Sequence, residues 1–134
     1  MKTLFQIICF IIFMAFIIIN AWYDSTHDTL LFGNHFASLI GRYILGFLLI
    51  ITSYKWKDVP FEWSTLGDFL IYGAAAWMIF DASFNFFRGI PLNYVGVTSW
   101  FDYFFHRFDP YAFTVQISVK GLILIAGIWL KIKY

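Results

Sequence analysis

The sequence has little charge, little proline and almost no cysteine. Only 13% of its 134 residues are charged and the net charge is +1, which excludes the basic surface that nucleic-acid binding requires. The single cysteine, Cys9, has no partner for a disulfide within the chain or for a thiolate metal site, so we expect it to be a small buried hydrophobe. The sequence contains no phosphate-binding glycine loop and no nucleophile elbow. We therefore expect no cofactor and no nucleic-acid partner.

Metal-ligating residues are present but scattered. His27, Asp28 and His35 lie near one predicted loop, and Asp102 and His106 lie near another. None of them has the tight spacing of a known metal motif, such as two histidines four residues apart. We interpret them as loop residues and predict no metal site.

Apolar residues dominate the composition. They make up 61% of the chain, aromatic residues alone make up 24%, and the mean hydropathy is +0.75. A soluble domain is about half apolar and about a quarter charged. Because a short chain buries only a modest share of its surface, the surplus of apolar side chains must face lipid. The lipid bilayer is therefore the first predicted partner.

Four long apolar runs predict four membrane-crossing helices, since about 20 apolar residues span the hydrocarbon layer. The first run has sixteen uncharged residues, Leu4 to Ile19, and is not followed by a small-residue cleavage signature. We interpret it as a retained helix rather than a cleaved signal peptide. The predicted fold is all-α, a single domain over residues 1–134 that forms an integral membrane bundle of four transmembrane helices. The expected spans are residues 4–22, 35–54, 66–87 and 110–130.

Local signals predict where the third and fourth helices begin. Ser64 and Thr65 are suitable N-caps, and Asp68 would then lie in the first turn, where an acid favours the helix dipole. Asp109 followed by Pro110 is a typical N-cap and first helical residue.

The long connection between these two helices is predicted to contain a short interfacial helix. Ser99 and Asp102 have the spacing of a capping box, and the stretch from Trp100 to Phe108 is almost wholly aromatic. Asp102 and His106 are four residues apart, so they share one helix face. A short helix lying in the membrane interface, as part of an aromatic belt, fits this composition.

The basic residues that flank the spans predict the orientation, since lysine and arginine favour the cytoplasmic side. Five flanking lysines fall on one side of a four-pass chain and two arginines on the other, which places both termini in the cytoplasm of a cell-membrane protein. The lysines are Lys2, Lys55, Lys57, Lys131 and Lys133, and the arginines are Arg88 and Arg107.

Three ionisable residues lie deep inside the predicted spans, away from their ends: Arg42, Asp81 and Lys120. Each costs roughly 2.5–3.5 kcal/mol to insert unless it is paired or reaches water. With a rise of about 1.5 Å per residue, Asp81 lies roughly 7 Å outward of the midplane. Because lysine has a long flexible stem, Lys120 can extend its amine several ångströms outward from near the midplane. We therefore expect all three charged groups to meet in one layer of the outer leaflet.

The third helix extends this layer, because Asp81, Asn85 and Arg88 share one helix face. In the structural interpretation, Asp81 pairs with Lys120 or Arg42 and fixes the helix register. In a functional interpretation, two cations against one carboxylate leave a net positive pocket for a phosphate or carboxylate. A proton or ion path through the same residues is the third interpretation.

Two stretches rich in small residues predict close helix packing. They are Gly73–Ala76 in the third span and Gly121–Gly127 in the fourth. Such surfaces also suit a homo-oligomer or the binding of partner transmembrane helices.

The segment from Phe80 to Asp102, FDASFNFFRGIPLNYVGVTSWFD, resembles small uncharacterised membrane proteins of bacterial or phage origin. The resemblance covers about 23 of the 134 residues and implies no activity. A phage context would be compatible with a lysis or exclusion protein.

The preferred interpretation is a small multi-pass membrane protein of non-enzymatic type, whose polar layer binds a partner helix or a lipid headgroup. The first alternative is a pore, a transporter subunit or a holin-like protein. The second is a membrane enzyme that acts on lipid-linked anionic substrates through Asp81, Arg88, Asp102 and His106. His106 would be its general acid or base, because histidine titrates near neutral pH.

Overall fold

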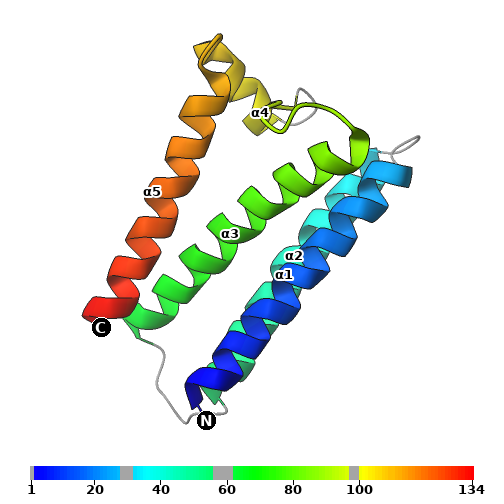
Figure 1. The fold of residues 1–134 in the computed structure, drawn as a ribbon. Coiled ribbons are helices and arrows are strands. Elements are labelled where there is room, and N and C mark those ends of the chain that lie inside the picture. The colour runs from blue at the N-terminus through cyan, green and yellow to red at the C-terminus, as the bar shows by residue number, and fades with distance from the viewer. Residues whose placement is uncertain (1, 28–31, 56–61, 97–99) are drawn as a thin grey trace.

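The computed structural model describes residues 2–27, 32–55, 62–96 and 100–134 (Figure 1). Within these ranges the chain is all-helical, as predicted, and contains no strand. Four helices are long and two helical segments are short. The long helices are α1 (Lys2–His27), α2 (Phe32–Lys55), α3 (Trp63–Arg88) and α5 (Ala112–Lys133), and the short segments are α4 (Trp100–Phe105) and the 3₁₀ turn η1 (His106–Phe108).

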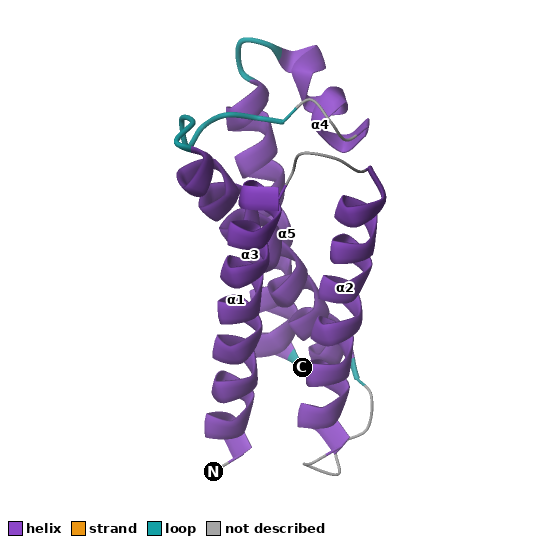
Figure 2. Ribbon diagram, turned by 90° about the vertical axis from the view of Figure 1, so that its right-hand side faces the viewer, coloured by secondary structure: helices purple, strands orange, loops and turns teal. Residues whose placement is uncertain are grey.

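Helix α3 lies at the centre of the molecule. It contacts α1 and α2 on one side and α5 on the other, whereas α5 contacts neither α1 nor α2 in the described residues. The four long helices are therefore arranged around α3, which separates α5 from α1 and α2. The two termini lie toward one end of the molecule, and α4 lies at the opposite end (Figures 1 and 2).

Three helical segments are long and apolar enough to cross a membrane: Leu4–Thr26, Trp63–Arg88 and Ala112–Lys133. Only 17–28% of the residues in their most apolar windows are buried inside the protein, so most of their apolar side chains point outward. In α2 the described apolar stretch is shorter, Ile40–Ser53. The apolar surplus seen in the composition is thus displayed on the outside of the helices, where lipid would solvate it.

The main hydrophobic core lies where α1, α2 and α3 meet. Tyr72 of α3 is at its centre: Phe13 stacks on its ring with centroids 5.2 Å apart, and Phe10 meets its edge at 5.1 Å. Ile17 of α1 is completely buried. The buried members of the core are Phe13, Met14, Ile17, Ile50 and Tyr72.

Helices α3 and α5 make backbone contact through Gly67 and Gly127. A Cβ atom added to Gly67 would lie 2.7 Å from the carbonyl oxygen of Gly127, and one added to Gly127 would lie 2.9 Å from the carbonyl oxygen of Gly67. Gly127 belongs to a stretch predicted to mediate close packing. In the other predicted stretch, Gly73–Ala76, Ala74 is 1% exposed, whereas a Cβ atom added to Gly73 or to Gly121 would have no neighbour within 4 Å. Which small residues face the partner depends on the rotation of each helix, which composition does not reveal.

Helix α3 begins three residues earlier than the predicted span. Its N-cap is Glu62, whose backbone N–H donates to the Thr65 hydroxyl at 3.3 Å, rather than Ser64 or Thr65 itself. The helix ends at Gly89, which has a left-handed φ of 66° that favours glycine.

Helix α5 begins at Ala112 with Tyr111 as N-cap, so the prediction of a helix start at Asp109 and Pro110 is wrong. The backbone turns once more first, because the N–H of Tyr111 donates to the carbonyl of Phe108 at 2.7 Å. The carboxylate of Asp109 contacts His106 and does not cap a helix. Helix α4 starts at Trp100, and the predicted cap Ser99 lies outside the described residues.

Candidate functional site

The predicted pairing of Asp81 is confirmed, and Lys120 is its partner. The Lys120 ammonium donates to Oδ2 of Asp81 at 2.5 Å, which joins the C-terminal half of α3 to the middle of α5. The Lys120 side chain is only 2% exposed, whereas that of Asp81 is 32% exposed. The ammonium also lies 4.6 Å from the ring centroid of Trp77, a favourable cation–π position. The Lys120 ammonium is therefore shielded from water and paired with a carboxylate inside the protein.

Arg42 of α2 is the second buried cation, with 9% exposure. Its guanidinium lies over the ring of Phe80, 3.7 Å from the centroid. The carboxylates of Asp24 and Asp81 both act on it electrostatically, and Asp102 acts in turn on Asp81. The sequence analysis did not place Asp24 or Asp102 in this cluster.

These five groups form what we call the charged layer. Each long helix contributes at least one group, and α4 contributes the fifth. These three carboxylates and two cations have a formal net charge of −1, whereas the sequence analysis considered only Asp81, Arg42 and Lys120, whose net charge is +1. The members are Asp24, Arg42, Asp81, Asp102 and Lys120.

Asn85 lies one turn beyond Asp81, as its spacing predicts, but its side chain serves the following loop. Its amide Nδ2 donates to the carbonyls of Leu92 at 3.3 Å and Tyr94 at 3.0 Å. Its own backbone carbonyl accepts from Ile90 at 3.1 Å. Asn85 is 4% exposed, so these bonds fix the path of the chain as it leaves α3.

Arg88, the last residue of α3, is exposed at the end of the molecule that carries α4. Its guanidinium lies 4.9 Å from the ring centroid of Phe84, one turn earlier on the same helix. The side chain thus covers an apolar surface while its charged head stays accessible.

Asp102 and His106 both face the segment that contains Val95 and Gly96, as expected for two residues on one helix face. A Cβ atom added to Gly96 would lie 2.9 Å from Oδ2 of Asp102. Nε2 of His106 lies 3.2 Å from the Val95 carbonyl and 3.1 Å from the Gly96 carbonyl. Nδ1 of His106 lies 3.0 Å from Oδ2 of Asp109. The hydrogen bond to Asp109 is the largest of the effects that raise the pKa of His106 above its ordinary value.

A small second core supports this corner. Phe105 of α4 is 1% exposed and packs with Val95 and Ala112. Its ring centroid lies 6.2 Å from that of Trp77, the residue that also contacts Lys120. Helix α4 is therefore anchored between α3 and α5, directly beside the ion pair.

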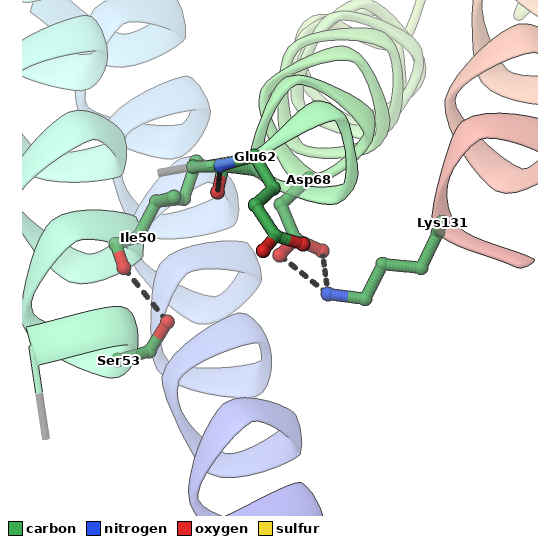
Figure 3. A network of polar contacts seen from close by, with 6 residues as sticks. Ile50, Ser53, Glu62, Asp68 and Lys131 are labelled. Atoms are coloured by element: carbon green, nitrogen blue, oxygen red, sulfur yellow. Dashed lines mark hydrogen bonds and ion pairs between the residues drawn. The ribbon is translucent and has the colours of Figure 1, made fainter. Parts of the chain in front are cut away.

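The sequence analysis missed a second ion pair between α3 and α5. The Lys131 ammonium lies 2.5 Å from both carboxylate oxygens of Asp68 (Figure 3). Asp68 was assigned to the helix dipole and Lys131 to the cytoplasmic flank. Along α3 the two pairs are 13 residues apart and along α5 they are 11 apart, which is the register of antiparallel helices. This antiparallel register is the sequence signal from which the Asp68–Lys131 pair could have been predicted.

No group of three or more His, Cys, Asp or Glu residues that could hold a metal ion is found in the part of the chain that the structure describes. Asp28 lies outside the described residues, as do the side chains of His27 and His35. Comparison with known proteins found no matching family, no matching curated protein and no matching solved structure.

Proposed function

We propose that the chain is a four-pass integral membrane protein of non-enzymatic type, whose charged layer fixes helix packing and whose outer rim binds lipid headgroups. The observation that carries this proposal is the Asp81–Lys120 pair, with a lysine that is 2% exposed between helices whose outward faces are apolar. A charge held in this way contributes to packing, because its partner already satisfies it.

Several features support four crossings. Helix α2 has 24 residues, and at about 1.5 Å per residue it is roughly 36 Å long, enough to cross the hydrocarbon layer. It lies against α1 and α3, both of which are long and apolar enough to cross. An even number of crossings also agrees with termini that lie toward the same end of the molecule (Figure 1).

Lipid headgroups are the favoured partner because exposed arginines and aromatic residues gather around the loop, α4 and η1. Arg88 and Arg107 are both exposed there. Guanidinium groups bind phosphate well, and aromatic side chains favour the membrane interface. This supports an interfacial position for α4. The exposed aromatic residues are Tyr94, Tyr103, Phe104, Phe108 and Tyr111, with 43–68% exposure.

Cysteine accessibility tests the topology. In a Cys9→Ala background, single cysteines would replace Asp28, Lys57, Arg107 and Lys133 in turn, and intact cells would be treated with an impermeant thiol reagent. We expect labelling at positions 28 and 107 and none at 57 and 133. Equal labelling at 28 and 57 would show that α2 does not cross, and the inverse pattern would reverse the orientation.

A double-mutant cycle tests the role of the charged layer. Asp81→Asn leaves the buried Lys120 ammonium without its carboxylate, and breaking a buried pair costs about 3–5 kcal/mol. The combined Asp81→Asn and Lys120→Met variant removes both charges, so its stability should return to within about 1 kcal/mol of the parent, the usual worth of an interhelical polar contact in a membrane. Thermal unfolding of the purified protein in detergent measures both. If the double variant is no more stable than the single one, the packing role is wrong.

A pore or transporter subunit is the second candidate, because the charged layer joins groups from five successive helices. In that case Asp81→Asn would change the ion leak of protein-containing vesicles while leaving thermal stability unchanged. The geometry gives less support to an enzyme, since both ring nitrogens of His106 are already engaged by protein acceptors.

A further inference from the structure

Among the residues that the structure describes, the hydrogen-bond partners of the His106 ring are all acceptors. Nδ1 faces the Asp109 carboxylate, and Nε2 faces the carbonyls of Val95 and Gly96. A neutral imidazole has one N–H and one lone pair, so either tautomer directs a lone pair at an oxygen within 3.2 Å. Only the imidazolium donates from both nitrogens. The geometry is therefore complementary to the protonated form.

The bonds of His106 join two segments that are distant from each other in sequence. They connect the loop after α3 to the corner formed by η1 and Asp109. The same loop contacts Asp102 through Gly96, and Asp102 acts electrostatically on Asp81 of the ion pair. A change at His106 is therefore positioned to reach the charged layer through the loop and α4.

We propose that residues 94–96 together with residues 102–109 form a proton-sensitive cap over the Asp81–Lys120 pair, closed while His106 is an imidazolium and loosened when it loses its proton. Loosening frees the loop from α4 and lets water reach Asp81, which is already 32% exposed. The cap is a property of this end of the molecule and holds whichever side of a membrane that end faces.

The direction of the pH effect follows from the charges around the ring. Asp109 favours the imidazolium through its hydrogen bond and its charge. Other charged groups at this end of the molecule are Arg107 on η1, Asp102 on α4 and the Asp81–Lys120 pair between α3 and α5. The hydrogen bonds to the imidazolium outweigh the loss of solvation and raise the pKa of His106 above 6.5. The cap is accordingly closed at pH values well below the raised pKa of His106 and opens as the pH rises through that pKa.

Spin-label distances test this directly. In a Cys9→Ala background, labels would be attached to cysteines replacing Leu92 and Tyr111, which are 60% and 68% exposed. The distance distribution would be measured in detergent and in lipid nanodiscs from pH 5 to pH 9. We expect a narrow distribution at low pH and a longer, broader one at high pH, with a midpoint above 6.5.

Three variants distinguish the effect of His106 titration on the cap from the effects of other titrating groups. His106→Gln should abolish the pH dependence, because the amide does not titrate. Asp109→Asn should lower the midpoint, because it removes the carboxylate that contributes most to raising it. Arg107→Gln, a matched loss of charge at the next residue, should keep a midpoint above 6.5. The proposal is overturned if the parent distribution does not change with pH, or if His106→Gln retains the parent transition.

Discussion

A single methyl group on Gly67 tests how tightly α3 and α5 are joined. In Gly67→Ala the new Cβ atom would lie 2.7 Å from the carbonyl oxygen of Gly127 and 3.0 Å from the backbone nitrogen of Lys131. Both are backbone atoms, which cannot rotate away as a side chain can. To restore an ordinary contact of 3.4 Å the two helices must move apart by about 0.7 Å at this crossing.

Two opposing terms set the expected magnitude. Overpacking of this kind costs about 1–3 kcal/mol, and alanine gains about 0.5–1 kcal/mol over glycine inside a helix. Gly73→Ala is the matched control, because it lies on the same helix and its Cβ would have no neighbour within 4 Å. Gly73→Ala should therefore show only the stabilisation that alanine provides over glycine inside a helix. We expect Gly67→Ala to be less stable than Gly73→Ala by about 1–3 kcal/mol.

The free energy of unfolding, measured by circular dichroism during denaturation in mixed micelles, compares the two variants. Gly127→Ala provides a second observation, since its Cβ would lie 2.9 Å from both the Gly67 carbonyl oxygen and a side-chain carbon of Ile71. Equal stabilities for Gly67→Ala and Gly73→Ala would refute the close crossing.

Three further changes probe the helix ends and the cap by thermal unfolding in detergent. Asp68→Asn should lower stability by about 1 kcal/mol, because Lys131 loses its carboxylate partner but remains 33% exposed to solvent. Lys133→Gln, which removes only the cation–π contacts to Trp129 and Tyr134, should have a smaller effect. Phe105→Ala should cost about 3–5 kcal/mol and make residues 102–111 sensitive to protease, whereas Phe104→Ala, at a position 46% exposed, should do neither. Gly89→Ala should cost about 1–2 kcal/mol, because its φ of 66° is unfavourable for a residue with a Cβ. A stability equal to the parent for any of these three main variants would contradict its assigned contact.

The helical class and three of the apolar helices follow from composition, because lipid-facing surface requires long uncharged runs. The helix ends do not follow in the same way. Helix α3 begins at Trp63 because Glu62 caps it, and α5 begins at Ala112 because the chain turns again after Asp109. The length of an apolar run is set by the thickness of the membrane, whereas the residue at which a helix begins or ends depends on individual backbone hydrogen bonds.

The candidate site was predicted in part for a similar reason. Depth along each helix was enough to predict that Asp81 would pair with Lys120 or Arg42, and the structure shows that Lys120 is the partner. Depth gives no rotation about the helix axis, so the sequence did not single out Gly67 as a residue of the close crossing. It also gives no side-chain direction, so the bonds from Asn85 to the loop were not foreseen.

The position of α5 has a mechanical consequence. Among the long helices it touches only α3, so the described molecule has a seam along which one helix can separate from the other three. The Asp68–Lys131 pair holds that seam near the C-terminus, and the Asp81–Lys120 pair holds it toward α4. A force that pulls the C-terminus away from α3 would break the Asp68–Lys131 pair first and the Asp81–Lys120 pair second. Breaking the Asp81–Lys120 pair would expose the buried Lys120 ammonium to its surroundings. The long helix with the fewest neighbours therefore also carries the charged side chain whose exposure costs the most free energy.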